Sequence, residues 1–565
     1  MADTIRKLFF LIKTSNLKKS YILLNFFLIL NLFFELIGIG ILIPLINFTI
    51  DPSSFANLIN KYDMLSFLNN SQEKLAVYFI YLVSFIFVFK ILIGVVYTWV
   101  VQNFIAKFED KLATLTLTKY YEYYDSYFLS KIEDLFTSVS HRTSRVAAST
   151  IFFSNLVSES IIFIIIFIFL LITSSTYALI SGFFLISISF LIFKFSNIRI
   201  KKYSFERSIH LTNKSNSLKE FFDGIREIII YLSGNILIKK FREENLKYLK
   251  PQKKIGFLNT APKFIFESLI FLTVVLILLN FSQNQNSQAV LFEIGIFIVL
   301  LLRILPSVNR ILLNFNNFRY TFEPIETLAS DLKVDQEIFV HKEFNFNNSI
   351  KIKELSFAYN SSDKIFEELN FEIKKNTKII FLGNSGVGKS TLIDLMIGIL
   401  KPSSGEVIID DKYAPTLSKN WLSLVSYVPQ KSYIHNESIK FNITFEFDTN
   451  HINENLYNKA LKISGLDKII SNGLDDSKDI GQFGSLISGG QKQRISIARA
   501  IYKDAPIIIM DEATNAIDIE SEKVILDKLL KLEDKTIIMV THRDKNLDKF
   551  DNVYKVEANK ITSIK

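Results

Sequence analysis

Long apolar stretches separated by polar or charged connections dominate the first 320 residues. A helix needs about 20 apolar residues to cross the roughly 30 Å hydrocarbon core of a bilayer. Six stretches meet this length, at residues 21–47, 75–105, 148–174, 176–197, 259–282 and 288–313. The pattern therefore predicts an all-α N-terminal domain over residues 1–320 with six membrane-spanning helices, and disfavours a soluble helical domain.

Basic residues are concentrated on one side of these predicted spans. Lysines and arginines precede the first span and are frequent in connections 106–147 and 198–258, whereas 48–74, 174–176 and 282–286 carry few or none. Such a bias places the basic connections in the cytoplasm, together with both termini. The first span is too long for a signal peptide and lacks a small-residue cleavage site, so we expect it to be retained. The net charge of +9 then reflects membrane topology. Nucleic-acid binding is not expected, because the sequence has no dense basic patch.

The hydrophobic pattern changes after residue 345. Short apolar runs at 377–382, 507–510 and 536–540 alternate with helical periodicity, which is typical of a buried parallel sheet with covering helices. We expect an α/β domain over 346–565, joined to the membrane domain by a linker over 321–345. The chain has no cysteine, which excludes disulfides, thiol catalysis and a fused cysteine-peptidase domain.

A phosphate-binding loop follows the first of these runs. The segment fits the pattern G-x-x-x-x-G-K-[ST], whose backbone N–H groups wrap nucleotide phosphates. Lys389 would neutralise the β and γ phosphates and Ser390 would bind Mg²⁺. The residues expected to hold ATP are Gly383, Asn384, Ser385, Gly386, Val387, Gly388, Lys389, Ser390 and Thr391.

Two carboxylates end the run at 507–510. Asp511 is expected to bind Mg²⁺, and the adjacent Glu512 to act as general base toward a water in line with the γ-phosphate. His542, at the end of the run at 536–540, is expected to sense that phosphate. Taken alone, an Asp-Glu pair is more often a solvated strand end and a lone histidine is more often structural.

These motifs resemble, in type and order, those of the nucleotide-binding domain of ABC transporters, from about residue 346 to the end. The resemblance implies that Tyr359 stacks on adenine and that Gln430 contacts Mg²⁺ and water. It also implies that the signature Ser488, Gly489, Gly490 and Gln491 binds ATP held by a second copy, so that the protein works as a homodimer. The sequence departs from the usual pattern at Ile487, Gln482 and 515–518. These departures put the fine tuning of communication between the two copies of the dimer in doubt.

The layout of six spans followed by this domain resembles ABC exporters. In that family, short helices between the spans couple the ATPase to the membrane domain. We expect such couplers near 131–145 and 205–219. A solvated amphipathic hairpin is the alternative at either place.

Charged residues inside apolar spans give a first indication of cargo. Each costs about 2.5–3.5 kcal/mol at the bilayer centre, and we therefore expect it to face a cavity or a partner. They are Glu35, Lys90, Glu159, Glu267, Arg303 and Arg310. Arg303 and Arg310 are seven residues apart, on one helical face, and are candidates to meet an anionic head group. Helix-end positions and structural ion pairs remain alternatives for the set.

The membrane part also resembles PglK-type lipid-linked oligosaccharide flippases, on residues 35–44, 261–267 and 302–310 and on loop 48–74, whose apolar residues could form an external interfacial helix. This resemblance implies ATP-driven movement of a polyprenyl-diphosphate-linked glycan to the outer leaflet of a bacterial inner membrane. Export of other lipids, amphipathic drugs or peptides stays open.

Overall fold

In a computed structural model, the described residues are 1–50, 72–122, 132–173, 176–281, 287–333, 346–359, 364–410, 412–413, 419–543, 547–557 and 560–565. They form two compact units, one made by the residues up to 333 and the other by those from 346 onward. The predicted interfacial helix of loop 48–74 falls mostly outside the described residues.

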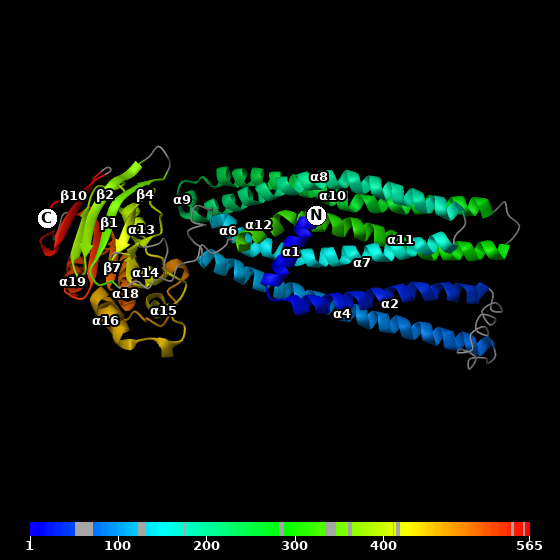
Figure 1. Ribbon diagram of the computed structural model, residues 1–565, viewed down its shortest axis with the longest axis horizontal. Coiled ribbons are helices and arrows are strands. Elements are labelled where there is room, and N and C mark those ends of the chain that lie inside the picture. The colour runs from blue at the N-terminus through cyan, green and yellow to red at the C-terminus, as the bar shows by residue number, and fades with distance from the viewer. Residues whose placement is uncertain are drawn as a thin grey trace. The chain divides into compact units, whose positions relative to one another are not determined.

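The first unit is helical (Figure 1). Its elements are α1 (Ala2–Thr14), α2 (Lys18–Ile50), α4 (Gln72–Glu122), α6 (Ile132–Thr137), a π-helical turn (Ser138–Arg142), α7 (Thr143–Thr173), α8 (Thr176–Asp223), α9 (Ile225–Ile230), α10 (Gly234–Phe281), α11 (Ser287–Tyr320) and α12 (Phe322–Lys333). Each of the six predicted apolar stretches lies in a separate long helix of this series.

Several of these helices are much longer than a bilayer requires. α8 and α10 each have 48 residues, which at 1.5 Å per residue gives about 70 Å, against roughly 30 Å of hydrocarbon. They therefore continue well past their apolar stretches. Among the described residues, three segments are long and apolar enough to cross a membrane, namely Lys18–Gly38, Ile80–Tyr121 and Asp134–Ile168.

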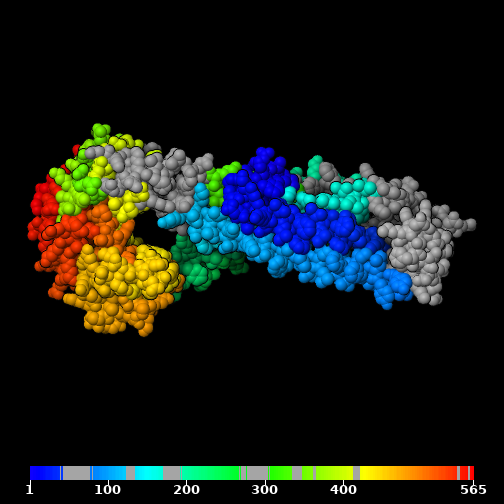
Figure 2. Space-filling view, turned by 60° about the horizontal axis from the view of Figure 1, so that its bottom comes forward, coloured from blue at the N-terminus to red at the C-terminus, as the bar shows by residue number. Residues whose placement is uncertain are grey.

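The long helices pack in pairs, with α2 beside α4, α7 beside α11 and α8 beside α10. Figure 2 shows α2 and α4 running side by side at the surface. A core of fully buried side chains, including Leu11, Phe108, Phe318 and Ile325, joins α1, α4, α11 and α12. Tyr120 donates a 2.6 Å hydrogen bond to Asp331, and Arg142 contacts Glu323 at 3.2 Å, so α12 is part of this unit although it lies in the stretch expected to be a linker.

A separate short helix was expected at 205–219 and is not found there. Residues 205–219 continue α8 without a break, because their polar and apolar positions keep helical periodicity. A short helix, α9, follows between Gly224 and Gly234, and its role in coupling stays a prediction. The first expected coupler, 131–145, covers α6, the π-helical turn and the start of α7 in its described part.

The second unit contains two sheets and their helices. One sheet has the order β2-β1-β4-β5 and is antiparallel; the other has the order β10-β9-β3-β8-β7-β6 and is parallel except for β10. The strands are β1 (Ser349–Ala358), β2 (Lys364–Lys374), β3 (Lys378–Leu382), β4 (Ser404–Ile409), β5 (Lys412–Tyr413), β6 (Val425–Val428), β7 (Ile507–Asp511), β8 (Thr536–Thr541), β9 (Asn552–Glu557) and β10 (Lys560–Ser563).

Helices cover the parallel sheet. They are α13 (Lys389–Ile397), α14 (Lys419–Ser423), α15 (Ile439–Thr444), α16 (Glu454–Ser464), α17 (Leu466–Ser471), α18 (Gly489–Tyr502) and α19 (Ile519–Leu530), with short 3₁₀ turns at Thr449–His451, Gln482–Gly484 and Leu547–Lys549. β3, β7 and β8 are buried along their whole length. Their carboxyl ends lie together because the strands are parallel neighbours, and this places the loops that follow them at one edge.

Candidate ATP site and membrane charge cluster

The predicted phosphate loop connects β3 to α13. Gly388 has φ +98°, and a Cβ there would lie 2.6 Å from the side chain of Ile365, so only glycine fits. Gly386 has φ +87° and open space where its Cβ would be. The loop thus leaves a cradle above the start of α13, where backbone N–H groups and the helix dipole favour an anion.

Lys389 points back into this loop. Its Nζ donates hydrogen bonds of 2.9 Å to the carbonyl oxygens of Gly383 and Asn384, and its side chain is 5% exposed. An ammonium enclosed in this way brings positive charge to the same cradle.

Glu512 is the centre of the site. It follows β7 in the left-handed region, with φ +46°, and its N–H donates to the carbonyl of Val540 at 3.0 Å. Its Oε2 accepts from Gln430 at 3.0 Å and from Asn515 at 2.8 Å. Its Oε1 lies 3.7 Å from Lys389 Nζ and 3.5 Å from His542 Nδ1. The fold therefore brings Lys389, Gln430 and His542 together around Glu512.

Asp511 lies at the end of β7 and is 3% exposed. Burial raises the pKa of Asp511, while a hydrogen bond from the Ser390 hydroxyl lowers it and the neighbouring charge of Glu512 raises it. Its Oδ1 is buried with no hydrogen-bond partner in the described structure. A buried, unpartnered carboxylate oxygen next to a hydroxyl suits Mg²⁺.

No cluster of three His, Asp or Glu side chains that could hold a metal occurs in the part of the chain that the structure describes. Mg²⁺ commonly takes only one or two protein carboxylates, and substrate phosphates and water complete its shell. Ser390 and Asp511 therefore fit such an ion.

The signature segment begins α18. The Ser488 hydroxyl accepts from the Gln491 N–H at 3.3 Å, and the Ser488 N–H donates to Gln491 Oε1 at 2.7 Å, which forms a capping box. A Cβ on Gly490 would lie 2.9 Å from the carbonyl oxygen of Ala516. None of the contacts described within this single chain joins 488–491 to Lys389 or Glu512, so the structure does not bring the signature to the chain's own loop.

Tyr359 lies just beyond β1 and is 54% exposed. Its hydroxyl is 3.2 Å from Thr391 Oγ1, in the first turn of α13, and its ring makes an edge contact with Phe357. An exposed ring next to the phosphate loop is in a position to receive a base.

Arg303 and Arg310 belong to the helical unit and are already partnered. Arg303 forms ion pairs with Glu35 and, at 3.7 Å, with Glu159. Arg310 Nε lies 3.1 Å from Glu159 Oε1. Ser307 also donates to Glu159, at 2.7 Å. This membrane charge cluster, Glu35, Glu159, Arg303, Ser307 and Arg310, links α2, α7 and α11.

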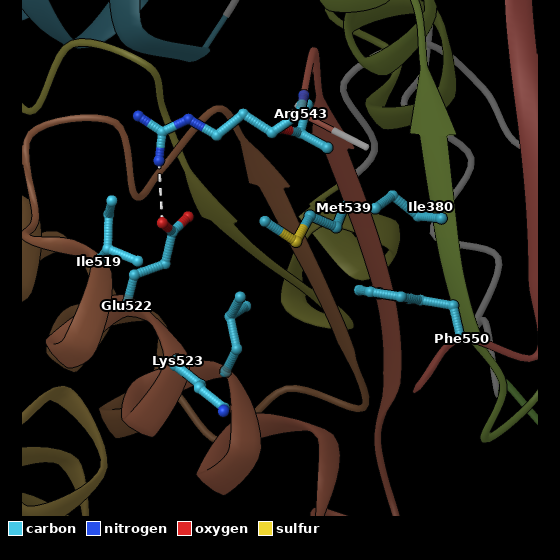
Figure 3. A pocket seen from close by; sticks show the side chains of 9 residues that line it. Ile380, Ile519, Glu522, Lys523, Met539, Arg543 and Phe550 are labelled. Carbon is cyan, nitrogen blue, oxygen red and sulfur yellow. Dashed lines mark hydrogen bonds and ion pairs between the residues drawn. The ribbon is translucent and has the colours of Figure 1, made fainter. Parts of the chain in front are cut away.

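Sequence reasoning missed a second contact set beside Glu512. Glu522, on α19, accepts from Thr514 Oγ1 at 2.6 Å and from Arg543 Nη1 at 2.8 Å, and so joins the turn after Glu512 to the residue after His542. Figure 3 shows Arg543 reaching across a cavity of about 370 Å³ to Glu522, with Met539 and Phe550 in its wall. Only the fold brings these three segments together, so no local sequence pattern could have indicated the contact. The sequence did mark the neighbouring Asn515, because it departs from the usual motif.

Comparison with known proteins agrees with this geometry. Residues 366–515 match the family model described as ABC transporter. The chain has the fold of a bacterial Atm1-family ABC exporter whose structure was solved with ATP bound. The TM-score is 0.78 at 17% identity, over 97% of this chain and 94% of that one. The second unit therefore contains an ABC transporter ATP-binding domain, and the chain has the ABC exporter fold, with an N-terminal helical domain of apolar helices.

Curated relatives fall into several transport classes. The chain is 38% identical to the lactococcin-G-processing and transport ATP-binding protein LagD of Lactococcus lactis subsp. lactis over 198 residues, which is 35% of this chain and 28% of that protein. It is 33% identical to a multidrug resistance ABC transporter ATP-binding and permease protein of L. lactis strain IL1403, over 38% of this chain and 37% of that protein. It is 27% identical to the ATP-dependent lipid A-core flippase of Pectobacterium atrosepticum over 61% of each. The chain thus matches between 28% and 61% of the length of these relatives.

Proposed function

We propose that two copies of this chain form an ATP-driven ABC exporter. The observation that carries the proposal is the convergence of Lys389, Gln430 and His542 on Glu512, beside a carboxylate suited to Mg²⁺. Hydrolysis needs a base near the γ-phosphate, a loop that neutralises the phosphate charge and ligands for a metal ion, and these residue types supply each of them.

In the proposed reaction Glu512 accepts a proton from the attacking water. Lys389 neutralises the β and γ phosphate oxygens, and Gln430 and His542 orient the water and the γ-phosphate that it attacks, with ADP as the leaving group. Mg²⁺, when bound by Ser390 and Asp511, would supply further charge neutralisation on those oxygens. Tyr359 stacks on the adenine.

The second copy would complete each site with Ser488, Gly489, Gly490 and Gln491. The start of α18 presents free N–H groups and the positive end of the helix dipole, which suit the γ-phosphate. Both sites of the homodimer would be equivalent and competent, because every charged catalytic group is present in the chain. ATP binding then draws two chains together.

For the cargo we propose a polyprenyl-diphosphate-linked oligosaccharide, moved from the cytoplasmic to the outer leaflet of a bacterial inner membrane. Charged side chains gathered inside apolar helices support a cargo with a charged head, and Arg303 and Arg310 were the first candidates to contact it. Relatives named as lipid A-core flippases support a lipid class. Similarity to a multidrug resistance transporter and to a lactococcin-G transport protein leaves drugs and peptides as alternative cargoes.

The test is ATP-dependent movement of a labelled lipid-linked oligosaccharide in proteoliposomes of the purified chain. Movement that requires ATP supports the cargo class. ATP hydrolysis without such movement would be consistent with the exporter assignment but would exclude the lipid-linked oligosaccharide as cargo. The same vesicles would then be assayed with plain phospholipid, drug and peptide.

A further inference from the structure

Glu522, in the first turn of α19, binds two separate loops with the two oxygens of its carboxylate. Oε1 accepts a 2.6 Å hydrogen bond from Thr514 Oγ1, and Oε2 forms a 2.8 Å ion pair with Arg543 Nη1. The Glu522 side chain is 13% exposed and Thr514 is buried, so water competes little for these contacts. Glu520, in the same helical turn, is exposed, and from there it can interact with the helix dipole. Helix-dipole stabilisation alone therefore does not explain the inward position of Glu522.

The two loops that Glu522 joins carry the proposed base and the proposed phosphate contact. Thr514 is two residues after Glu512, and Arg543 directly follows His542. Glu512 Oε1 lies 3.5 Å from His542 Nδ1. Glu522 thus closes a ring of contacts within which Glu512 and His542 face each other.

Both loops depend on such a contact. Glu512 has φ +46°, a left-handed conformation that persists in a non-glycine residue only where neighbouring contacts hold it. On the other loop, the His542 side chain is 43% exposed, and Arg543 extends over the cavity of about 370 Å³ to reach Glu522 (Figure 3). An unfilled space beside Arg543 supplies no packing contacts on that side. The position of Arg543, and with it that of His542, therefore depends on the ion pair.

We propose that Glu522 is a positioning residue for ATP hydrolysis, which holds Glu512 and His542 at their working separation without touching the nucleotide. The inference rests on the proposed function. None of the contacts described for Glu522 joins it to the phosphate loop, so ATP affinity should not depend on it. Misplacing a catalytic group by about 1 Å lowers a rate by up to about 100-fold. Loss of Glu522 should therefore slow hydrolysis and leave nucleotide binding intact.

The first test is steady-state ATP hydrolysis by the purified full chain in proteoliposomes, at a temperature at which circular dichroism shows every variant to be folded. Glu522→Gln removes the charge and keeps the size of the side chain. We expect it to lower kcat about tenfold and to leave KM for ATP within about twofold of the native value. The matched control is Asp527→Asn, which removes a 2.5 Å ion pair with Lys549 from the same helix and involves neither loop. It should hydrolyse ATP as the native chain does.

The second test is hydrogen–deuterium exchange of the same three proteins, which follows the two loops without hydrolysis. In Glu522→Gln, the amides of segments 512–518 and 541–543 should exchange at least about tenfold faster than in the native chain, because local opening of both loops becomes easier. Asp527→Asn should match the native chain in both segments.

Four results would overturn the proposal. They are native kcat in Glu522→Gln, a raised KM with kcat unchanged, native exchange in both segments, and an equal loss of kcat in Asp527→Asn, which would indicate a general loss of stability. The exchange test separates this proposal from the proposed function. Faster exchange in Glu522→Gln, together with a native chain that hydrolyses no ATP, would support the positioning contacts and refute the proposed function.

Discussion

Asn515 donates a 2.8 Å hydrogen bond to the carboxylate of Glu512, three residues earlier in the chain. Gln430 donates to the same oxygen, so two amides fix one face of this side chain while Lys389 and His542 lie by the other oxygen. Asn515 stands where ABC transporters usually have serine, and the shorter serine hydroxyl does not reach as far. In this chain, the turn that follows Glu512 therefore orients the proposed base directly.

Replacing Asn515 by Ser should slow hydrolysis without weakening nucleotide binding. Loss of one hydrogen bond worth about 1 kcal/mol corresponds to roughly a fivefold lower rate. Steady-state kinetics should show kcat reduced by about that factor and KM for ATP unchanged. A KM that rises while kcat stays constant would show that Asn515 acts on binding and not on Glu512.

Glu522 should stabilise the ATP-binding domain through Thr514 and Arg543. Replacement by Gln removes the charge of a mostly buried acceptor, and we expect a loss of about 1–2 kcal/mol in the free energy of unfolding, seen as a lower Tm. Glu520→Gln, two residues earlier at an exposed position of α19, is the control and should leave Tm unchanged. Equal shifts for the two variants would contradict a specific role for Glu522.

Arg303 should be important for the stability of the helical unit. Removing it by Arg303→Gln leaves Glu35 and Glu159 without their shared partner, and breaking a buried pair costs about 3–5 kcal/mol. Thermal denaturation in detergent should show a large loss of Tm. Arg310→Gln should cost less, because that side chain is half exposed. If Arg303→Gln were as stable as the native protein, Arg303 would not stabilise the contacts of α11 with α2 and α7 in the membrane charge cluster.

Tyr359 should contribute to ATP affinity by stacking. Aromatic stacking on a base is worth about 1–3 kcal/mol, so Tyr359→Ala should weaken ATP binding roughly tenfold or more. Tyr359→Phe keeps the ring and loses only the contact with Thr391, and it should bind within a few fold of the native chain. Binding of a fluorescent ATP analogue measures both, and equal losses in the two variants would assign the effect to the hydroxyl.

The parts of the fold that could be predicted are those fixed by local pattern. Apolar runs expected at 377–382, 507–510 and 536–540 became β3, β7 and β8, because a strand buried on both faces is apolar throughout. The phosphate loop was predictable for the same reason, since its glycines and Lys389 act within one short segment.

Contacts between distant segments could not be predicted. Glu35 and Arg303 are 268 residues apart, and sequence analysis noted both charges without pairing them. α9 was missed because the signal for a new helix there is only Gly224 and Gly234, whereas the continuous periodicity of 205–219 suggested an independent helix. Helical periodicity alone does not reveal where one long helix ends.

Glu512 is the proposed base for the ATP hydrolysis that we propose powers transport of a lipid-linked glycan. The most direct measurement compares ATP-dependent flipping of a labelled lipid-linked oligosaccharide by the native chain and by Glu512→Gln in proteoliposomes. We expect flipping by the native chain, and a loss of flipping and hydrolysis of at least about 100-fold in the variant, because Gln cannot accept the proton. Equal flipping by both would show that transport does not depend on Glu512.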